Sequence, residues 1–205
     1  ITEAYQRFVP PQLVRDLGKK SILDVHLGDQ VEVERSILFS DIRDFTTISE
    51  DMTPQQTFAL VNDYLGRMGP IVRSQSGYID KFMGDGLMAL FNRSASDAVT
   101  AAIKMQHDLL EYNRVATNTG QPLIDIGVGV NTGKMMLGTL GEAGRMEGSV
   151  ISDAVNLAAR LEGLTKLYQT GVLISEETYL ALNKETFSVR LIDQVAVKGK
   201  KKSVM

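Results

Sequence analysis

Two apolar runs each end in an aspartate at a turn, and this pattern restricts the fold more than any other feature of the chain. Asp41 follows the β-prone run at residues 36–39, and Asp85 lies in the turn Gly84-Asp85-Gly86 between two further apolar runs. Short apolar runs bounded by turn residues are typical of strands, so both carboxylates are expected at strand ends. Mg²⁺ prefers one or two carboxylates completed by phosphate oxygens and water, so this pair suits a divalent cation.

Each aspartate taken alone has an ordinary alternative, because aspartate is common in turns. One helix and one strand are expected between Asp41 and Asp85, so adjacent strands could place both at one end of a sheet. In two-metal catalysis, ions about 3.5–4 Å apart activate the attacking oxygen and stabilise the leaving one. Considered jointly, and together with the candidate residues described below, the aspartates favour a metal site over two unrelated turns.

Composition excludes several classes of protein. The chain has 205 residues, of which 43% are hydrophobic and 23% are charged, and this is enough for one sizeable domain. A formal net charge of −3 argues against a nucleic-acid partner, because such proteins neutralise many phosphates with basic surfaces. The absence of cysteine excludes disulfides, thiolate metal sites and cysteine nucleophiles, and two isolated histidines disfavour a zinc site.

The apolar runs fall short of the roughly 20 residues that a membrane span requires, and no segment resembles a secretory signal. We therefore expect a soluble, cytoplasmic domain with no membrane span in this segment, in a full-length protein that could still be attached to a membrane. The chain begins at Ile1 without an initiator methionine, so we expect upstream regulatory domains outside it.

The first 34 residues are expected to form a lead-in segment, 1–34, that contains a short helix at 12–17. The main domain is expected at 35–205, and its first strand at 35–39.

A capping pattern predicts the first long helix. Thr53 supplies an N-cap, Pro54 the first helical position and Gln56 the third, and the helix is expected to end near residue 75. Its apolar residues at helical spacing predict a buried stripe of Phe58, Val61, Leu65 and Met68.

The remaining elements follow from hydrophobic period and turn residues. In chain order they are a hairpin of strands 78–83 and 87–91, a helix at 96–116, a second hairpin of strands 124–130 and 134–139 across Asn131-Thr132-Gly133, a helix at 154–164, a strand at 172–175, a helix at 176–182 and a final strand region at 187–197. The order β-α-β-β-α-β predicts an α+β fold: a ferredoxin-like core with additional C-terminal strands and helices, and with helices packed on one face of the sheet.

Asn156 and Arg160 stand four residues apart on a predicted helix, so one face presents an amide and a guanidinium together. Arginine can stabilise charge that develops on a phosphoryl group, and an amide can hold a sugar oxygen. The alternative is an ordinary solvated helix face.

Three lysines are candidate nucleotide ligands. Lys81 lies in an otherwise apolar strand, where its ammonium either reaches solvent or donates to an acceptor on a purine. Lys134 and Lys198 are candidate phosphate ligands, although surface lysines are common and each alone is weak evidence.

Five spaced segments together resemble the class III nucleotidyl cyclase catalytic domain, most closely the bacterial, cyanobacterial-type adenylyl cyclases. They are Phe39–Thr46, Tyr78–Gly86, Gly127–Gly133, Arg145–Arg160 and Val197–Lys200. The resemblance covers nearly the whole chain from about residue 35, so it implies that 35–205 is a cyclase catalytic domain. The implied reaction converts ATP to 3′,5′-cyclic AMP and pyrophosphate.

The resemblance implies a role for each matching residue on the metal and base side. Asp41 and Asp85 match the two metal-binding aspartates, with the Ile42 backbone carbonyl as a further ligand. The implied cofactor is two Mg²⁺ ions, with Mn²⁺ as the alternative. Lys81 matches the adenine-selecting lysine, a position where guanylyl cyclases have glutamate.

Five further residues match positions that contact the sugar, the phosphates or the base. Asn156 matches the residue that orients the ribose, and Arg160 matches the transition-state arginine. Lys198 matches the lysine that binds the terminal phosphates, and Lys134 a basic residue that reaches the same group. Ser149 stands at the second base-selecting position, where adenylyl cyclases typically have aspartate or threonine.

Serine at position 149 keeps a hydroxyl that can donate and accept, so adenine recognition is retained while the missing methyl loosens the fit. This hydroxyl resembles the bicarbonate-responsive subgroup, and stimulation by bicarbonate is therefore a hypothesis.

The family also implies a head-to-tail homodimer with its active sites at the interface. The nearest competing enzyme is a guanylyl cyclase, against which Lys81 argues, because an ammonium cannot accept from the guanine ring NH and amine. A catalytically inactive nucleotide-sensing dimerisation module would be expected to have lost an aspartate, Asn156 or Arg160. A diguanylate cyclase or polymerase-palm relative would share the sheet and the metal chemistry, but the GGDEF string of the former is absent.

Overall fold

A computed structural model describes residues 9–142 and 144–194 of the chain. Its elements, in chain order, are α2 (Pro11–Asp16), the 3₁₀ helix η1 (Ile22–Asp24), β1 (Gln30–Ile42), α3 (Phe45–Glu50), α4 (Pro54–Ser74), β2 (Gly77–Met83), β3 (Gly86–Phe91), α5 (Ala95–Thr119), β4 (Ile126–Glu142), β5 (Arg145–Ile151), α6 (Asp153–Leu167), β6 (Val172–Ile174) and α7 (Glu176–Leu180).

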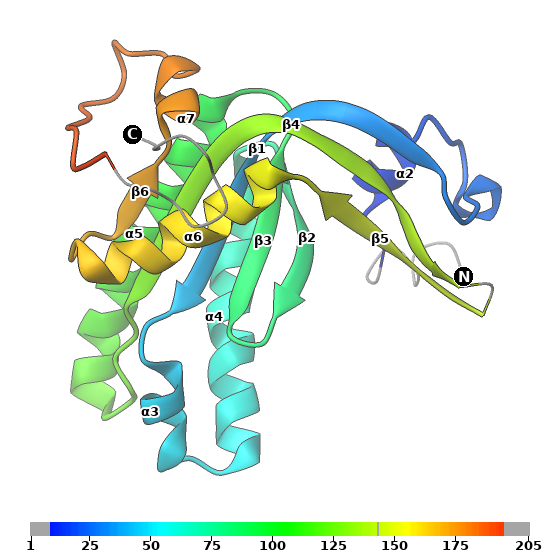
Figure 1. Cartoon of the computed structure of the whole chain (residues 1–205). Helices are drawn as coiled ribbons and strands as arrows, with labels where there is room; N and C mark the ends of the chain where they lie inside the picture. The colour runs from blue at the N-terminus through cyan, green and yellow to red at the C-terminus, as the bar shows by residue number, and fades with distance from the viewer. Residues whose placement is uncertain (1–8, 143, 195–205) are drawn as a thin grey trace.

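The described strands form one sheet in the order β2-β3-β1-β4-β5, with β6 added in parallel beside β4 (Figure 1). The segments β1, α4, β2, β3, α5 and β4 form the βαββαβ core, so the predicted ferredoxin-like α+β fold is confirmed. The first strand begins five residues earlier than expected, because Gln30 already pairs with Gly138 of β4. Within the described residues, no helix combines the length and the apolar character needed to cross a bilayer.

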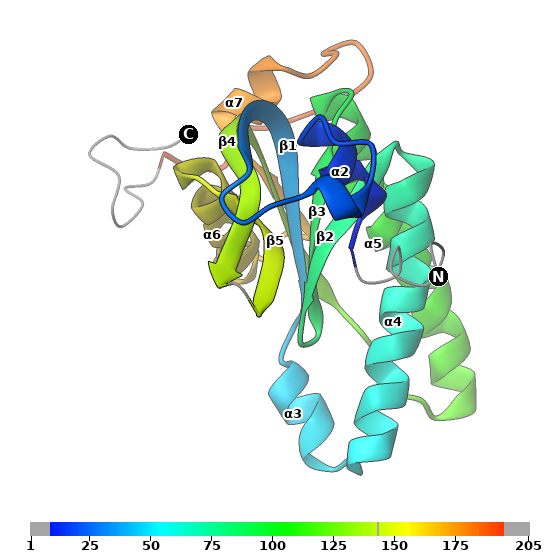
Figure 2. The ribbon, with the colours of Figure 1, turned by 90° about the vertical axis from the view of Figure 1, so that its right-hand side faces the viewer.

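Helices cover both faces of the sheet, not one face as predicted (Figure 2). The larger apolar cluster packs α4 and α5 against β1, β3 and β4. A second cluster on the opposite face joins Leu13 of α2 and Ala158 of α6 to Ile37, Leu90 and Leu137 of the strands. The expectation was wrong because alternate strand residues on both faces are apolar, and each apolar face requires a cover.

The α4 helix starts as the capping pattern predicts. The Thr53 hydroxyl accepts from the backbone N–H of Gln56, while the Gln56 side chain accepts from the backbone N–H of Thr53. Its buried stripe is different from the expected one, because only Met68 of the predicted residues is buried and Phe58 is 73% exposed. The stripe that faces the sheet is Leu60, Tyr64, Met68 and Val72.

Tyr64 explains why α4 is rotated away from the expected stripe. Its ring is fully buried, and its hydroxyl lies 2.7 Å from the hydroxyl of Ser40 on β1. A buried tyrosine needs such a partner, and Ser40 supplies it at the centre of the sheet. Helical spacing alone permits either stripe, so the choice depends on this long-range contact.

The predicted hairpin across residues 131–133 is wrong. β4 runs without interruption through this segment and pairs with β1 from Ile126↔Ile42 to Gly138↔Gln30. Asn131 is buried, donates to the carbonyl of Ala154 at 2.9 Å and accepts from the hydroxyl of Ser175 at 2.6 Å. These bonds satisfy the polar groups of the Asn131 side chain inside the strand, whereas an asparagine without such partners would favour a turn.

The chain reverses instead between Glu142 and Arg145, so β5 is an element that the sequence did not predict. The predicted strand at 187–197 is also wrong in its described part, because residues 187–194 contain no strand. Its last residues, 195–197, lie outside the described part of the chain.

Glycines in β4 allow α6 to lie directly on the sheet. A Cβ added at Gly129 would overlap the carbonyl oxygen of Ala158 and the backbone nitrogen of Glu162. A Cβ at Gly133 would lie 3.1 Å from that of Ala154. Because residues two apart in a strand share a face, the glycines of the GVGVNTG segment form a smooth surface for one helix.

We expect Gly129→Ala to lower the free energy of unfolding by about 3 kcal/mol, because the added methyl meets backbone that cannot rotate away. For a domain of this size, the melting temperature should fall by about 6–12 °C. Gly163→Ala on α6 is the matched control, because nothing lies within 4 Å of its added Cβ. Alanine there should stabilise the helix by about 0.5–1 kcal/mol. Equal melting of Gly129→Ala and the wild type would contradict the close approach of α6.

Candidate active site

The structure brings Asp41 and Asp85 together at one end of the sheet. Asp41 is near the end of β1, and Ser40 pairs with Leu87 of β3, directly after the turn that contains Asp85. A Cβ added at Gly86 would lie 2.9 Å from Oδ1 of Asp41 and 3.0 Å from the carbonyl oxygen of Ser40. Glycine at position 86 therefore leaves room for the Asp41 carboxylate beside the turn.

The two carboxyl groups repel each other. Desolvation, followed by the charge of Asp85 and that of Glu162, raises the pKa of Asp41 to about 7. A divalent cation between the carboxylates would remove this repulsion, so the donor set fits such an ion. Among the described residues, no three histidine or carboxylate side chains lie close enough to hold a metal by themselves. The side chains would thus supply two carboxylates, and the other ligands would come from backbone oxygens, water or a bound molecule.

Glu162 on α6 is a site residue that the sequence analysis missed. Its pKa is raised, mainly by burial, with Arg43 lowering it and Asp85 raising it. Its carboxylate lies over Gly127, which is paired with Asp41. No local pattern marks Glu162, because its position depends on α6 crossing β4 and not on its sequence neighbours.

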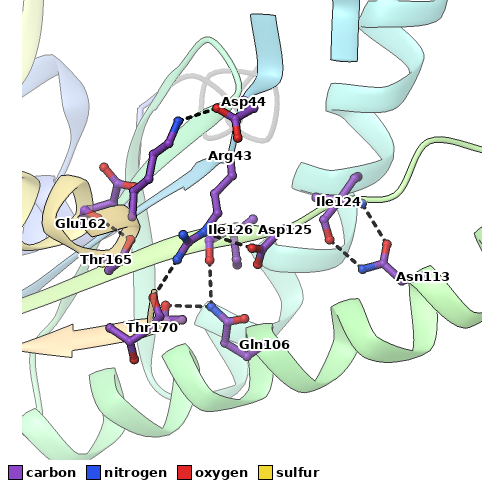
Figure 3. Close-up of polar contacts among 12 residues, drawn as sticks. Arg43, Asp44, Gln106, Asn113, Ile124, Asp125, Ile126, Glu162, Thr165 and Thr170 are labelled. Carbon is purple, nitrogen blue, oxygen red and sulfur yellow. Dashed lines mark hydrogen bonds and ion pairs between the residues drawn. The ribbon is translucent and has the colours of Figure 1, made fainter. Parts of the chain in front are cut away.

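Arg43 fixes the turn that follows Asp41 (Figure 3). Its guanidinium donates to the carbonyl of Thr170 at 2.7 Å and pairs with Asp125 at 3.2 Å, while its backbone N–H donates to the Asp125 carbonyl. The next residue, Asp44, has a left-handed backbone with φ 53° and forms an ion pair with Lys166 of α6. The turn at residues 43–44, directly after Asp41, is therefore bonded to three other segments of the chain.

Asn156 and Arg160 do not face the two aspartates. Ala158 and Glu162 of α6 lie against the β4 glycines. At about 100° per residue, positions 156 and 160 are on the opposite side of the helix. Both are exposed, and among the described residues neither side chain has a hydrogen-bond or ion-pair partner. The chain therefore presents an acidic site on one side, and an outward amide and guanidinium that face a different way.

The two base-selecting candidates lie on different strands. Lys81 is on β2, opposite Met88, and its side chain is 36% exposed. Ser149 is on β5, opposite Gly138. Leu13 of α2 lies against Gly148, so the lead-in helix packs directly beside Ser149.

The remaining lysines are not brought to Asp41. Lys134 is exposed, is paired with Glu34 in register and forms an ion pair of 3.1 Å with Glu32. Seven register positions separate it from the partner of Asp41, which corresponds to roughly 23 Å along the strand. Lys198 lies outside the described residues.

Comparisons with known proteins agree with this fold. The model of the adenylate and guanylate cyclase catalytic domain matches residues 29–205. An adenylate cyclase of Anabaena cylindrica is 40% identical over 98% of this chain, which spans 42% of the length of that relative. The structure of the adenylyl cyclase CyaB from P. aeruginosa matches with a TM-score of 0.78 at 34% identity, over 85% of this chain and 92% of the other.

A guanylyl cyclase is about as similar in structure. The structure of Cya2 matches with a TM-score of 0.76 at 33% identity, over 87% of this chain and 91% of the other. The fold thus defines a class III nucleotidyl cyclase domain, as the sequence motifs predicted. The chain belongs to the family of adenylate and guanylate cyclase catalytic domains.

Proposed function

We propose that this domain is an adenylyl cyclase, which converts ATP to 3′,5′-cyclic AMP and pyrophosphate at a homodimer interface. The observation that carries the proposal is the pairing of Asp41 with Asp85 at one sheet end, while Asn156 and Arg160 point outward from α6. Similarity to named adenylyl cyclases supports it. We expect the domain to act in the cytoplasm, where ATP is available, under upstream regulatory domains.

In the proposed reaction, the ribose 3′-oxygen of ATP attacks the α-phosphorus of the same molecule. The bond from the α-phosphorus to the leaving pyrophosphate breaks, and the 3′-hydroxyl proton passes to a substrate oxygen or to water. Asp41, Asp85 and the Ile42 carbonyl would hold two Mg²⁺ ions, with Mn²⁺ as the alternative. When bound, these ions neutralise the triphosphate and lower the pKa of the 3′-hydroxyl.

The chain's own side chains orient the substrate and stabilise charge. Asn156 fixes the ribose so that attack is in line, and Arg160 donates to the oxygens around the α-phosphorus as charge develops there. Lys134 and Lys198 are proposed ligands of the terminal phosphates. Because Lys134 is distant from Asp41 of its own protomer, its contact would be with a nucleotide held partly by the second copy.

A second copy is needed because the acidic site and the outward face of α6 diverge within one chain. In a two-fold dimer, Asp41 and Asp85 of one protomer face Asn156 and Arg160 of its partner, and the symmetry builds two equivalent sites. Lys81 and Ser149 are proposed to come from the same protomer as Arg160.

Lys81 supports adenine over guanine. Its ammonium can donate to N1 of adenine, and the Ser149 hydroxyl can accept from the exocyclic amine. The alternative is a guanylyl cyclase. By fold alone, the similarity to Cya2 supports this alternative about as strongly as the similarity to CyaB supports an adenylyl cyclase. The choice therefore depends on residue 81 and not on the overall structure.

The test is incubation of the purified protein with ATP or GTP and either Mg²⁺ or Mn²⁺, followed by chromatography of the products. We expect cyclic AMP and pyrophosphate in equal amounts, and much less cyclic GMP. Cyclic GMP as the main product would establish the guanylyl cyclase alternative. Nucleotide binding without either cyclic product would indicate an inactive sensing or dimerisation module.

We further propose stimulation by bicarbonate, on the basis of the Ser149 hydroxyl alone. The measurement is cyclase activity at constant pH and ionic strength with added sodium bicarbonate, and with sodium chloride as the control. Indifference to bicarbonate would end this proposal and leave the cyclase reaction unaffected.

A further inference from the structure

A β-bulge turns the side chain of Asp80 towards that of Lys81. In the β2–β3 pair, Ile79 lies opposite Ala89 and Lys81 lies opposite Met88, so consecutive residues of β3 face β2 residues that are two apart. Asp80 is the extra residue. In a regular strand, neighbouring side chains point to opposite faces, whereas a bulge allows both to turn to one side. Here Nζ of Lys81 lies 3.5 Å from Oδ2 of Asp80.

The two partners differ in their exposure to water. The Asp80 side chain is only 4% exposed, while that of Lys81 is 36% exposed. The Asp80 carboxylate is thus a fixed, buried end of the pair, and the Lys81 ammonium is the end that a ligand can reach. This arrangement suits a lysine whose head group must be held in one place.

Asp80 has little reason to be buried for stability. Its Oδ2 is buried and accepts no hydrogen bond from the described residues. Burial raises the pKa of Asp80 and Lys81 lowers it, so the lysine is what favours the charged form. Burying a carboxylate whose one partner lies 3.5 Å away costs free energy, and burying an apolar side chain in its place would not.

Lys81 and Glu147 act on the charge of Asp80 in opposite directions. Glu147 of β5 acts electrostatically on Asp80 and raises its pKa. Glu147 lies two residues before Ser149, so both side chains are on the same face of β5.

We propose that Asp80 is a positioning residue that holds the Lys81 ammonium at the purine N1 and thereby sets the preference for adenine. The inference rests on the proposed function, in which Lys81 reads the base. A lysine side chain has four rotatable bonds, so a fixed counter-charge beside Nζ reduces the number of positions that the ammonium samples. Asp80 itself does not touch the substrate.

The test is Asp80→Asn, which keeps the size of the side chain and removes its charge. We expect kcat/KM for ATP to fall about tenfold, with kcat/KM for GTP unchanged within about twofold. Purine riboside triphosphate keeps N1 but lacks the 6-amino group, so its kcat/KM should fall by the same factor as that of ATP. Asp97→Asn on α5 is the matched control, because Asp97 is also a buried carboxylate paired with one cation, Arg93, and lies outside the proposed site. It should leave the ATP to GTP ratio within about twofold.

A double mutant separates positioning from a general structural effect. In a Lys81→Met background, Asp80→Asn should cause no further change in the ATP to GTP ratio. Equal losses for ATP and GTP, or an additional loss in the Lys81→Met background, would overturn the inference. If Lys81→Met alters the ratio and Asp80→Asn does not, the inference fails while the proposed function stands. If the wild type makes no cyclic nucleotide, the proposed function itself fails.

Discussion

Replacement of Asp41 or Asp85 by asparagine is expected to lower kcat by about 10³-fold or more. Each change removes one of the two carboxylates that would hold the ions beside the triphosphate, and several kcal/mol of charge stabilisation depend on those ions. The measurement is the initial rate of cyclic AMP formation with saturating ATP, in Mg²⁺ and separately in Mn²⁺.

The loss should not come from unfolding. Because repulsion from Asp85 contributes to the raised pKa of Asp41, Asp41→Asn should melt no lower than the wild type in metal-free buffer at pH 8. Asp44→Asn is the matched control, because Asp44 makes only an exposed ion pair and asparagine tolerates its left-handed backbone. We expect its activity to stay within about threefold of the wild type. Wild-type activity in Asp41→Asn would show that the aspartates do not hold the catalytic ions.

Mixing two inactive variants is expected to restore activity. In Asp41→Ala the arginine side of the site is intact, and in Arg160→Ala the metal side is intact. A mixed dimer therefore contains one complete site. With random exchange, half of the dimers are mixed and each has one of two sites, so activity should reach about one quarter of the wild-type value. The assay is cyclic AMP formation after co-incubation of the two proteins at equal concentration.

The control mixture is Asp41→Ala with Asp85→Ala. Both changes affect the metal side of the site, so no combination of these protomers builds an intact one, and the mixture should stay inactive. Restoration in the control, or none in the first mixture despite measured exchange of protomers, would contradict an active site shared between two copies.

The local elements could largely be predicted from the sequence. The capping box at Thr53 and Gln56 forms as expected, and the hairpin around residues 84–86 carries Asp85 at its turn. These features depend on residues close in the chain, where backbone sterics and nearby side chains decide the conformation. The family motifs likewise predicted the cyclase fold that the comparisons support.

The errors lie where distant residues decide between local alternatives. Asn131, Thr132 and Gly133 have the composition of a turn, yet they continue β4 because Ala154 and Ser175 bind the Asn131 side chain. The α4 helix turned a different stripe to the core because Ser40 accommodates the Tyr64 hydroxyl. In both cases a buried hydrogen bond outweighs a local preference that is worth little by itself.

The sequence by itself determined the long helices, the strand that carries Asp41, the hairpin that carries Asp85 at its turn, and the types of side chain available for chemistry. Only the tertiary structure decided which of those side chains meet. It placed Glu162 beside Asp41 and directed Arg160 away from it. It also turned the Asp80 carboxylate towards the Lys81 ammonium through a single bulged residue. The physical reason is that spacing along a chain sets the faces of separate elements, whereas helix crossings and strand register set the distances between them.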